Sequence, residues 1–510
     1  MSISCLLGID LGTSACKALL LSTDGRIVAT ASSAYEVVQP RPRWVEQDPA
    51  LWIAAVRQAV AQAMQAAGPV EVLCIGLSGQ MHGLTALDGQ GQPLRPAILW
   101  NDQRNEVEAA EITATAGGLE ALLRITGNRM LVGYTGGKLL WMKKHEPHLY
   151  ARLRHVLNPK DYLRHVLTGV FATEVSDASG TGLFDVRRRE WARALIEALG
   201  LSPAHFPDCN ESRQVSGRLH AAGAALLGLP QGLPVIGGGG DSVIQSLGAG
   251  VVAPGVLQTT VGTAGILAAA LAQPLDCPDG RIQVFCNVDP RRWHAMGVSL
   301  NAGGALAWFR QRMNEAVGNE VQTFESLVAA AQRSVPGARG LLFLPYLNGE
   351  RCPHPDPAAR AAFIGLTARH DFADLCRSVL EGVVHSLCDM QALMAAMGVR
   401  ASLVSTSGGG ARSACWRQIQ ADMLGCDVVT RQGAAEGAAL GAALLAGVGM
   451  GVWSDIDVAA ALLQELSRER PIPAHQACYA QAREIHQGLY PLLAGSFARL
   501  GELAEQGAAA

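Results

Sequence analysis

Two short segments of the chain have the composition of a turn that binds phosphate. The first contains Gly12-Thr13 and the second contains Gly262-Thr263, each between two predicted strands. Glycine allows a tight turn and a close approach of the backbone to a ligand. Threonine adds a hydroxyl beside exposed backbone N–H groups, and such a concavity suits an anion. Both segments are therefore candidate phosphate sites.

Only the first turn follows an acidic residue, Asp10, at the end of its predicted strand. A carboxylate beside a phosphate would repel it unless a cation lies between them. This pattern favours Mg²⁺ at Asp10 and a nucleotide as the ligand. The alternative is that Asp10 only accepts hydrogen bonds from its own turn. Because the second turn lacks the acid, a dedicated metal role is favoured.

A second acidic residue, Asp241, directly follows four consecutive glycines, Gly237 to Gly240. A short apolar segment precedes these glycines. Such a backbone can come close to a substrate. The alternative is a solvated carboxylate at a hinge. The glycine spacing does not match a dinucleotide-binding fingerprint.

Two more glycine-containing segments follow predicted strands. Gly408 to Gly410 precede a predicted helix. This arrangement suits a flat purine or ribose that lies on bare backbone. The alternative is a tight connection between strand and helix with no ligand. Met81 and His82 lie between Gly79 and Gly83, and an imidazole that donates and accepts hydrogen bonds suits a polyol. A purely structural histidine is the alternative reading there.

The whole chain has 510 residues, enough for two to four domains, and a net charge of −3. This charge gives no electrostatic case for a nucleic-acid or membrane partner. Its 12 cysteines are scattered, which indicates reduced thiols and a cytoplasmic protein without a secretory leader. Residues 437–453 carry no charge, but their glycines favour a helix packed closely on a sheet over a membrane span.

Strands and helices alternate, which indicates an α/β fold. Asp48 and Pro49 predict the start of a helix that Gly68 ends, and Asp371 and Gly398 bound a comparable helix in the second half. The last thirty or so residues also look helical. Since each Gly-Thr turn begins a half with a similar order of elements, we expect two related domains.

Several strings, in this order along the chain, resemble the FGGY carbohydrate kinases, and most closely the members that act on D-xylulose. They are Gly8 to Ser14, Gly79 to Gly83, Arg95 to Asp102, Lys138 to Trp141, Pro159 to Leu163, Phe343 to Leu347, Gly349 to Arg351 and Gly408 to Ser413. The resemblance implies two ribonuclease-H-like (actin-like ATPase) domains with an interdomain active-site cleft. It implies that ATP phosphorylates D-xylulose to D-xylulose 5-phosphate in D-xylose catabolism.

The resemblance also implies boundaries and partners. Residues 1–240 would form an N-terminal domain with the sugar site and the first phosphate turn. Residues 241–490 would form a C-terminal domain with the nucleotide site, and residues 491–510 a C-terminal tail. ATP and Mg²⁺ are the implied cofactors, a small ketose the implied substrate, and a homodimer a plausible assembly.

Each candidate residue takes a role from this resemblance. Asp241 would accept the proton of the sugar hydroxyl, and Asp10 would hold Mg²⁺. The sugar would lie beside Asp241 and contact a further set of residues: Met81, His82, Trp100 and Ser242. The phosphates would lie on Gly12, Thr13, Gly262 and Thr263, and the adenosine on Gly409, Gly410 and Ala411.

Other functions stay open at this point. The family commonly has Asn or Gln where this chain has Ser242, so the substrate could be another ketose or polyol such as ribulose. A non-catalytic sugar sensor would need neither Asp10 nor Asp241. An actin-like filament or chaperone ATPase would share the phosphate turns but would have no use for the Met81-His82 segment.

Overall fold

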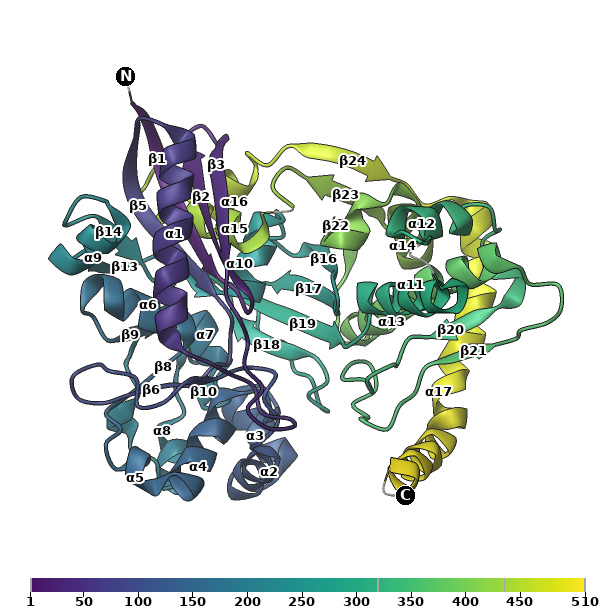
Figure 1. Cartoon of the computed structure of the whole chain (residues 1–510), viewed down its shortest axis with the longest axis horizontal. Helices are drawn as coiled ribbons and strands as arrows, with labels where there is room; N and C mark the ends of the chain where they lie inside the picture. Colours follow the sequence, from purple (N-terminus) through teal and green to yellow (C-terminus); the bar gives the residue numbers. More distant parts are fainter. Residues whose placement is uncertain (1, 319–320, 435, 509–510) are drawn as a thin grey trace. The chain divides into compact units, whose positions relative to one another are not determined.

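The computed structural model of the chain describes residues 2–318, 321–434 and 436–508 (Figure 1). Packing divides the chain into two compact units. Unit 1 contains Met1–Ala253, Ala270–Ala295 and Glu436–Gln464, and unit 2 contains Pro254–Ala269, Met296–Ala435 and Glu465–Ala510. Because the two units interleave along the chain, they are not its two sequential halves. The domain boundaries at 240/241 and 490/491 stay a prediction.

The first sheet has seven strands and holds the first Gly-Thr turn. Its strands lie in the order β13 (Val215–Arg218), β14 (Pro234–Ile236), β5 (Val70–Gly79), β1 (Ile3–Leu11), β2 (Ala15–Ser22) and β3 (Ile27–Ala34), and β15 (Gly239–Gly240) also pairs with β5. Strand β1 is antiparallel to β2 and parallel to β5. The turn therefore joins an antiparallel pair at the edge where β5 also ends.

The second sheet also has seven strands. They lie in the order β18 (Gln283–Cys286), β19 (Trp293–Ser299), β17 (Gly265–Leu271), β16 (Gly255–Val261), β22 (Ala401–Ser407), β23 (Asp427–Arg431) and β24 (Glu465–Glu469). Strand β16 is antiparallel to β17 and parallel to β22. This repeats the pattern of β1 with β2 and β5, and it confirms the predicted duplication.

The helices begin and end where the capping residues predict. Helix α1 spans Pro49–Ala67, with the Asp48 side chain accepting the N–H of Ala50 at 2.9 Å. Helix α13 spans Phe372–Ala396 behind a capping box at Asp371. The remaining α-helices are α2 (Glu106–Thr115), α3 (Leu119–Thr126), α4 (Thr135–His145), α5 (Pro147–Tyr150), α6 (Pro159–Thr168), α7 (Val175–Ser179), α8 (Arg193–Ala198), α9 (Ala221–Leu227), α10 (Asp241–Gly248), α11 (Gly303–Val317), α12 (Phe324–Ala331), α14 (Ala414–Leu424), α15 (Gly437–Gly449), α16 (Ile456–Ala460) and α17 (Pro473–Ala508).

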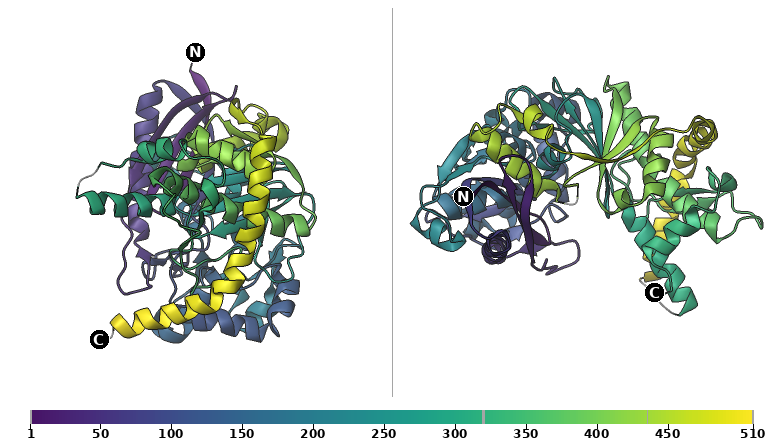
Figure 2. Two further views of the ribbon diagram at one scale, coloured as in Figure 1. Left: turned by 90° about the vertical axis from the view of Figure 1, so that its right-hand side faces the viewer. Right: turned by 90° about the horizontal axis from the view of Figure 1, so that it is seen from above.

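Helix α17 contains the C-terminal segment that the sequence predicts as helical. Figure 2 (left) shows it as one long yellow helix that bends towards its C-terminal end. Pro491 lies inside this helix, and a proline removes one backbone hydrogen bond and kinks the chain. Residues 509–510 of the expected tail lie outside the described residues.

Short strand pairs complete the fold. They are β4 (Glu46–Gln47) with β7 (Ala97–Ile98), β6 (Thr85–Leu87) with β8 (His155–Leu157), β9 (Ala172–Glu174) with β12 (Asp208–Asn210), β10 (Phe184–Asp185) with β11 (Glu190–Trp191), and β20 (Leu342–Leu344) with β21 (Ala362–Ile364).

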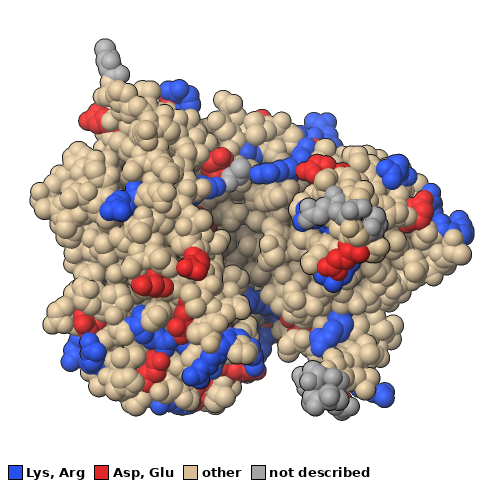
Figure 3. Space-filling view, viewed as in Figure 1, with Lys and Arg blue, Asp and Glu red and all other residues tan. Residues whose placement is uncertain are grey.

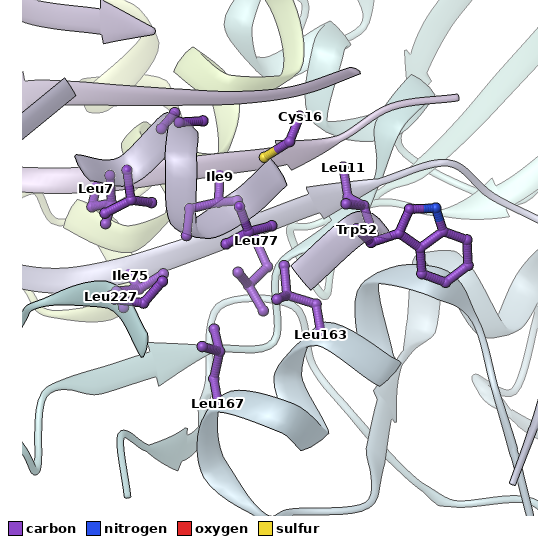
Figure 4. Packing of buried hydrophobic residues seen from close by; sticks show 14 of the residues in the cluster. Leu7, Ile9, Leu11, Cys16, Trp52, Ile75, Leu77, Leu163, Leu167 and Leu227 are labelled. Carbon is purple, nitrogen blue, oxygen red and sulfur yellow. The ribbon is translucent and has the colours of Figure 1, made fainter. Parts of the chain in front are cut away.

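Alternate residues of β1 build the core of unit 1. Leu7, Ile9 and Leu11 point to one face of the sheet and pack with Trp52 of α1 and Leu163 of α6 (Figure 4). All five side chains are fully buried. Since successive strand residues face opposite sides, Asp10 is turned away from this apolar layer.

The other face of β1 and β5 is covered by α15, the uncharged segment predicted from the sequence to be a packed helix. A Cβ atom added to Gly8 would lie 2.0 Å from the carbonyl oxygen of Ala439, and one added to Gly76 would lie 1.9 Å from that of Ala442. Only glycine allows this approach, so the prediction of a closely packed helix is confirmed. Nowhere in the described part of the chain is a helix long and apolar enough to cross a membrane.

The face of the molecule drawn in Figure 3 carries basic and acidic side chains side by side among uncharged ones. Many charged side chains of the protein are paired, for example Arg468 with Asp427 at 2.6 Å. The small net charge of the chain is therefore a balance of both signs.

Replacing Gly76 by alanine tests the packing of α15. We expect Gly76→Ala to lower the melting temperature strongly, because the new methyl group would overlap the backbone of α15. The control is Gly488→Ala on α17, where no atom lies within 4 Å of the added Cβ. That variant should melt no lower than the parent, since alanine favours a helix over glycine by about 1 kcal/mol. Equal melting temperatures for the two variants would contradict the close packing.

Candidate active site

Three strands of unit 1 end together and present the candidate catalytic segments at one edge of the sheet. In the strand register, Gly79 of β5 lies opposite Leu11 of β1 and opposite Gly240 of β15. The next residues along the chain are the first Gly-Thr turn, the Met81-His82 segment and Asp241. Ligands of open α/β sheets bind at the carboxyl ends of parallel strands. The structure thus brings these three predicted segments to one place.

Asp10 lies one residue before the end of β1, between two polar neighbours. It is paired with Lys17 on β2 and with Ser78 on β5, and the Ser78 hydroxyl donates to its Oδ1 at 2.8 Å. Burial raises the pKa of Asp10, and the Ser78 hydrogen bond and the charge of Lys17 act in the opposite direction. A carboxylate in this setting is stabilised by a cation.

Asp241 is the first residue of α10, directly after the four glycines. Its Oδ1 accepts the backbone N–H of Ser242 at 2.7 Å. Burial and then the negative charge of Asp10 raise the pKa of Asp241 to about 7, against the effect of the Ser242 N–H. At neutral pH this carboxyl group can therefore exchange a proton readily, as a general base must.

The glycines before Asp241 are held by buried polar groups. The guanidinium of Arg164 donates to the carbonyl oxygen of Gly237 at 2.9 Å. The N–H of Gly240 donates to the Ser176 hydroxyl at 3.0 Å, and that hydroxyl donates to the Glu174 carboxylate at 2.8 Å. The flexible segment is thereby fixed at both ends.

Arg164 and Glu174 belong to a buried ionic cluster, defined here as Lys160, Asp161, Arg164, Glu174 and Asp177, all without solvent exposure. Burial works to raise the pKa of Asp161, but the two cations outweigh it and hold that pKa low. Burial and the neighbouring carboxylates raise the pKa of Asp177 well above its usual value. The cluster thus places two cations among three carboxyl groups in one buried network.

His82 lies in a strained conformation beside aromatic rings. Its φ angle is +68°, which non-glycine residues rarely adopt. Its Nδ1 is 2.7 Å from the carbonyl oxygen of Gly180, and the Tyr134 ring stacks on the imidazole at 4.6 Å. Lys138 donates to the His82 carbonyl oxygen at 2.8 Å. The fold therefore holds this imidazole in one orientation.

The other predicted sugar contacts differ in their surroundings. Met81 is only 3% exposed, and its Sδ would lie 2.7 Å from a Cβ added to Gly240, so it packs beneath the glycine segment. The indole N–H of Trp100 donates to the Thr13 hydroxyl at 2.9 Å. In this structure Trp100 thus positions the phosphate turn, and its role towards a sugar stays a prediction, as does that of Ser242.

The second Gly-Thr turn lies in unit 2 against the start of α11. The N–H groups of Ala302 and Gly304 donate to the carbonyl oxygen of Thr263 at 2.8 and 3.1 Å, and that of Gly303 donates to Gly262 at 2.7 Å. A Cβ on Gly303 would come within 2.7 Å of the Gly262 oxygen, so this contact needs glycine.

A pocket of about 690 Å³ in unit 2 opens beside this turn. Of the predicted nucleotide contacts, Gly262, Thr263, Gly409 and Gly410 line it. Ala411 is buried and is not among the lining residues. The walls are mostly apolar, and the volume is in the range of known ligand pockets.

Several lining residues are not among those predicted from the sequence. They are the glycine pair Gly303 and Gly304 and the apolar residues Leu306, Phe324, Val328 and Trp416. The glycine pair follows β19 and could have been found as a strand-to-helix glycine turn. Phe324 and Val328 look like ordinary core residues of a helix, so the sequence carries no signal for them.

The comparisons with known proteins agree with this arrangement. Residues 5–248 match the N-terminal domain of the FGGY family of carbohydrate kinases, and residues 257–450 match its C-terminal domain. The chain belongs to the FGGY family of carbohydrate kinases. As an FGGY kinase it is an enzyme that uses ATP and acts on a small carbohydrate. Its fold is the two-domain actin-like ATPase fold expected from the sequence, while the cleft between the domains stays a prediction.

Individual relatives of this FGGY kinase cover nearly its whole length. The xylulose kinase of Escherichia coli (strain K12) is 39% identical over 499 residues, which are 96% of this chain and 100% of the relative. The xylulose kinase structure from Rhodospirillum rubrum has 30% identity and a TM-score of 0.88 over 97% of this chain and 99% of the other. The gluconate kinase structure from Lactobacillus acidophilus has 26% identity and a TM-score of 0.92 over 98% of this chain and 100% of the other.

The raised pKa of Asp241 makes a prediction about stability. The pKa of Asp241 is near 3.8 in the unfolded chain and about 7 in the folded protein. The free energy of unfolding therefore falls as the pH rises between these two values, and it stays low at higher pH. An asparagine side chain cannot ionise, so Asp241→Asn should melt at least about 2 °C above the parent at pH 8. The difference should shrink towards pH 4. A variant that melts lower than the parent at pH 8 would refute the raised pKa.

The pocket in unit 2 makes a prediction about nucleotide binding. A Cβ added to Gly409 meets no atom within 4 Å, so Gly409→Leu should fold normally and place its side chain at the pocket. We expect the ADP dissociation constant, measured by calorimetry, to rise at least about tenfold, which is a loss of about 1.4 kcal/mol. Gly488→Leu on α17 is the control and should bind ADP as the parent does. Unchanged ADP affinity in Gly409→Leu would exclude this pocket as the nucleotide-binding site.

Proposed function

We propose that this enzyme phosphorylates the terminal hydroxyl of D-xylulose with ATP, giving D-xylulose 5-phosphate and ADP. The observation that carries the proposal is the pair of carboxyl groups at the edge of the first sheet, with the pKa of Asp241 raised to about 7 partly by the charge of Asp10. The identity of 39% to a xylulose kinase over the full length of that relative supports the choice of substrate.

The reaction transfers one proton and one phosphoryl group. The hydroxyl oxygen of the sugar forms a bond to the γ-phosphorus while the bond from that phosphorus to the β,γ-bridging oxygen breaks. The hydroxyl proton passes to Oδ of Asp241, and ADP leaves. Because the transition state is loose, positioning and charge neutralisation contribute more than the strength of the base.

Asp10 fits the role of a Mg²⁺ ligand. Its oxygens are hard donors of the kind this ion prefers, and Mg²⁺ is commonly bound by one or two carboxylates together with substrate phosphates and water. The effect of the Asp10 charge on the pKa of Asp241 supports this role, because a cation would relieve the repulsion between the two carboxyl groups. When bound, Mg²⁺ would neutralise charge that develops on the phosphates.

The chain's own groups would bind and orient the two substrates. The Gly12-Thr13 and Gly262-Thr263 turns would accept the phosphates through their backbone N–H groups and hydroxyls. The pocket of unit 2 would accept the adenosine between glycine backbone and the apolar residues Phe324 and Val328. His82, held by Gly180 and Tyr134, would hydrogen-bond the sugar.

A second candidate is the same chemistry on another sugar. Ser242 stands next to the proposed base, and its short hydroxyl cannot reach as an amide side chain would. Ribulose, another ketose or a polyol is the alternative substrate, and a structural relative with a TM-score of 0.92 is a gluconate kinase. A homodimer and a cytoplasmic location remain predictions from the sequence.

One assay decides between these substrates. ADP release should be measured with D-xylulose, D-ribulose, glycerol and D-gluconate at equal concentration. We expect the highest kcat/KM for D-xylulose. A higher value for any other compound would replace D-xylulose as the substrate, and no ADP release with any of the four would mean that the acceptor is a carbohydrate outside this set.

The role of Asp241 is tested on the same assay. Asp241→Asn should lower kcat by about 10²–10⁴-fold, the usual contribution of a general base, while the ADP dissociation constant stays that of the parent. A near-normal kcat in this variant would overturn the assignment of the base.

A further inference from the structure

The carbonyl groups of the first phosphate turn are held from behind by two side chains. The Tyr35 hydroxyl donates to the carbonyl oxygen of Gly12. The side-chain amide of Gln47 donates to the carbonyl oxygen of Thr13 at 2.7 Å. In a trans peptide the N–H points away from the C=O of the same unit. The N–H groups of Thr13 and Ser14 therefore point to the opposite side.

Within the described residues these two N–H groups have no protein acceptor. Among the hydrogen bonds of residues 2–318, 321–434 and 436–508, neither Thr13 nor Ser14 donates its N–H to a protein acceptor. Successive N–H groups that point to one side form an anion-binding concavity. The direction in which the carbonyls are held thus decides where this concavity faces.

Gln47 uses its whole hydrogen-bonding capacity in this position. It is fully buried, and its Oε1 accepts the indole N–H of Trp52 at 2.9 Å and the amide of Gln80 at 3.0 Å. Its Nε2 donates to Glu36 at 3.1 Å as well as to Thr13. Because an indole can only donate, the oxygen of Gln47 must face Trp52 and the nitrogen must face the turn.

The backbone of Gln47 is fixed as well. Its strand β4 pairs with β7. The neighbouring Glu46 carboxylate pairs with Arg95 and, at 2.7 Å, with Arg104. The side chain therefore cannot swing away from the turn without breaking buried contacts, and removing one partner of a buried ion pair is costly.

In the second turn, backbone N–H groups rather than side chains hold the carbonyl oxygens. There the carbonyl oxygens of Gly262 and Thr263 accept backbone N–H groups from the start of α11. In the described part of the chain no helix start donates to the carbonyls of the first turn, so side chains supply the donors. The comparison indicates that in both turns the carbonyl oxygens must point into the protein. In the first turn the side chains of Gln47 and Tyr35 hold them in that direction.

We propose that Gln47 is a positioning residue for phosphate binding: by holding the Thr13 carbonyl, it aims the N–H groups of the first Gly-Thr turn at the terminal phosphates of the nucleotide. The inference rests on the proposed function only in so far as that turn binds phosphate. It does not depend on which sugar is the acceptor.

The test compares two variants that each lose buried hydrogen bonds of Gln47. Gln47→Met keeps the length and burial of the side chain but has no donor for the Thr13 carbonyl. Trp52→Phe removes only the indole donor to the opposite side of Gln47, where Gln80 still donates. Calorimetry would measure the dissociation constants of AMP-PNP with Mg²⁺ and of adenosine, and melting temperatures would be recorded for both variants.

We expect Gln47→Met to weaken AMP-PNP binding at least about tenfold and to leave adenosine binding unchanged. Trp52→Phe should lower the melting temperature while binding AMP-PNP like the parent. Parent-like AMP-PNP binding by Gln47→Met, or equal weakening in both variants, would overturn the proposal, since the second result is what a merely structural role predicts.

A milder variant covers the case in which Gln47→Met does not fold. Tyr35→Phe removes the donor to the Gly12 carbonyl and should also weaken AMP-PNP binding without changing adenosine binding; parent-like affinity would count against the proposal. A parent enzyme that binds AMP-PNP but fails to phosphorylate D-xylulose would refute the substrate assignment and leave the test of Gln47 intact.

Discussion

The candidate active site depends on holding two carboxyl groups near each other, although the negative charge of Asp10 raises the pKa of Asp241. Asp10 is fixed because it belongs to β1, whose neighbours β2 and β5 set its position by register. Asp241 follows four glycines and would be mobile by itself. Arg164 of the buried ionic cluster holds the backbone of those glycines, as does Ser176, whose hydroxyl donates to Glu174 of the cluster. The unfavourable proximity persists because the surrounding packing is stronger than the repulsion, as is usual for strained functional sites.

The cluster shows why burying five ionisable groups is tolerated in this place. An isolated buried charge is very costly, but here two cations lie among three carboxyl groups and pair with them. Each group also makes hydrogen bonds to the backbone or to its neighbours, so few lone pairs are left without a donor. What the fold gains is a rigid attachment for a segment whose own residues have no side chains.

Much of this arrangement is visible in the sequence, and the reasons for the rest are physical. Asp10, Asp241 and the two Gly-Thr turns stand next to strands and glycines, and such local patterns carry chemical meaning. The starts of α1 and α13 follow from capping residues. Gln47 gives no such signal, because its partners Thr13, Trp52 and Gln80 come together only in the folded sheet. The pocket wall from Phe324 and Val328 is likewise made by tertiary packing of a helix that reads as core.

The duplicated topology was predictable from the repeat of the turns, but the exchange of segments between the units was not. Residues 436–464 pack with unit 1, although they follow most of unit 2 in the sequence. Their helix α15 is composed mainly of alanine, glycine and leucine, a composition that indicates close packing without naming the partner sheet. The partner is identified by Gly8 and Gly76, which lie far away in the chain and give α15 the space it needs.

The late position of α15 in the sequence has a consequence for the synthesis of the protein. When a ribosome has made the first 253 residues, strands β1 and β5 already exist, but the helix that covers one of their faces has not been synthesised. At about 5–20 residues per second, the strands wait roughly 10–40 s for residues 437–449. During that interval an apolar sheet face is open to chaperones or to other nascent chains. The N-terminal part of this kinase can therefore complete its core only after Gly449 has been translated.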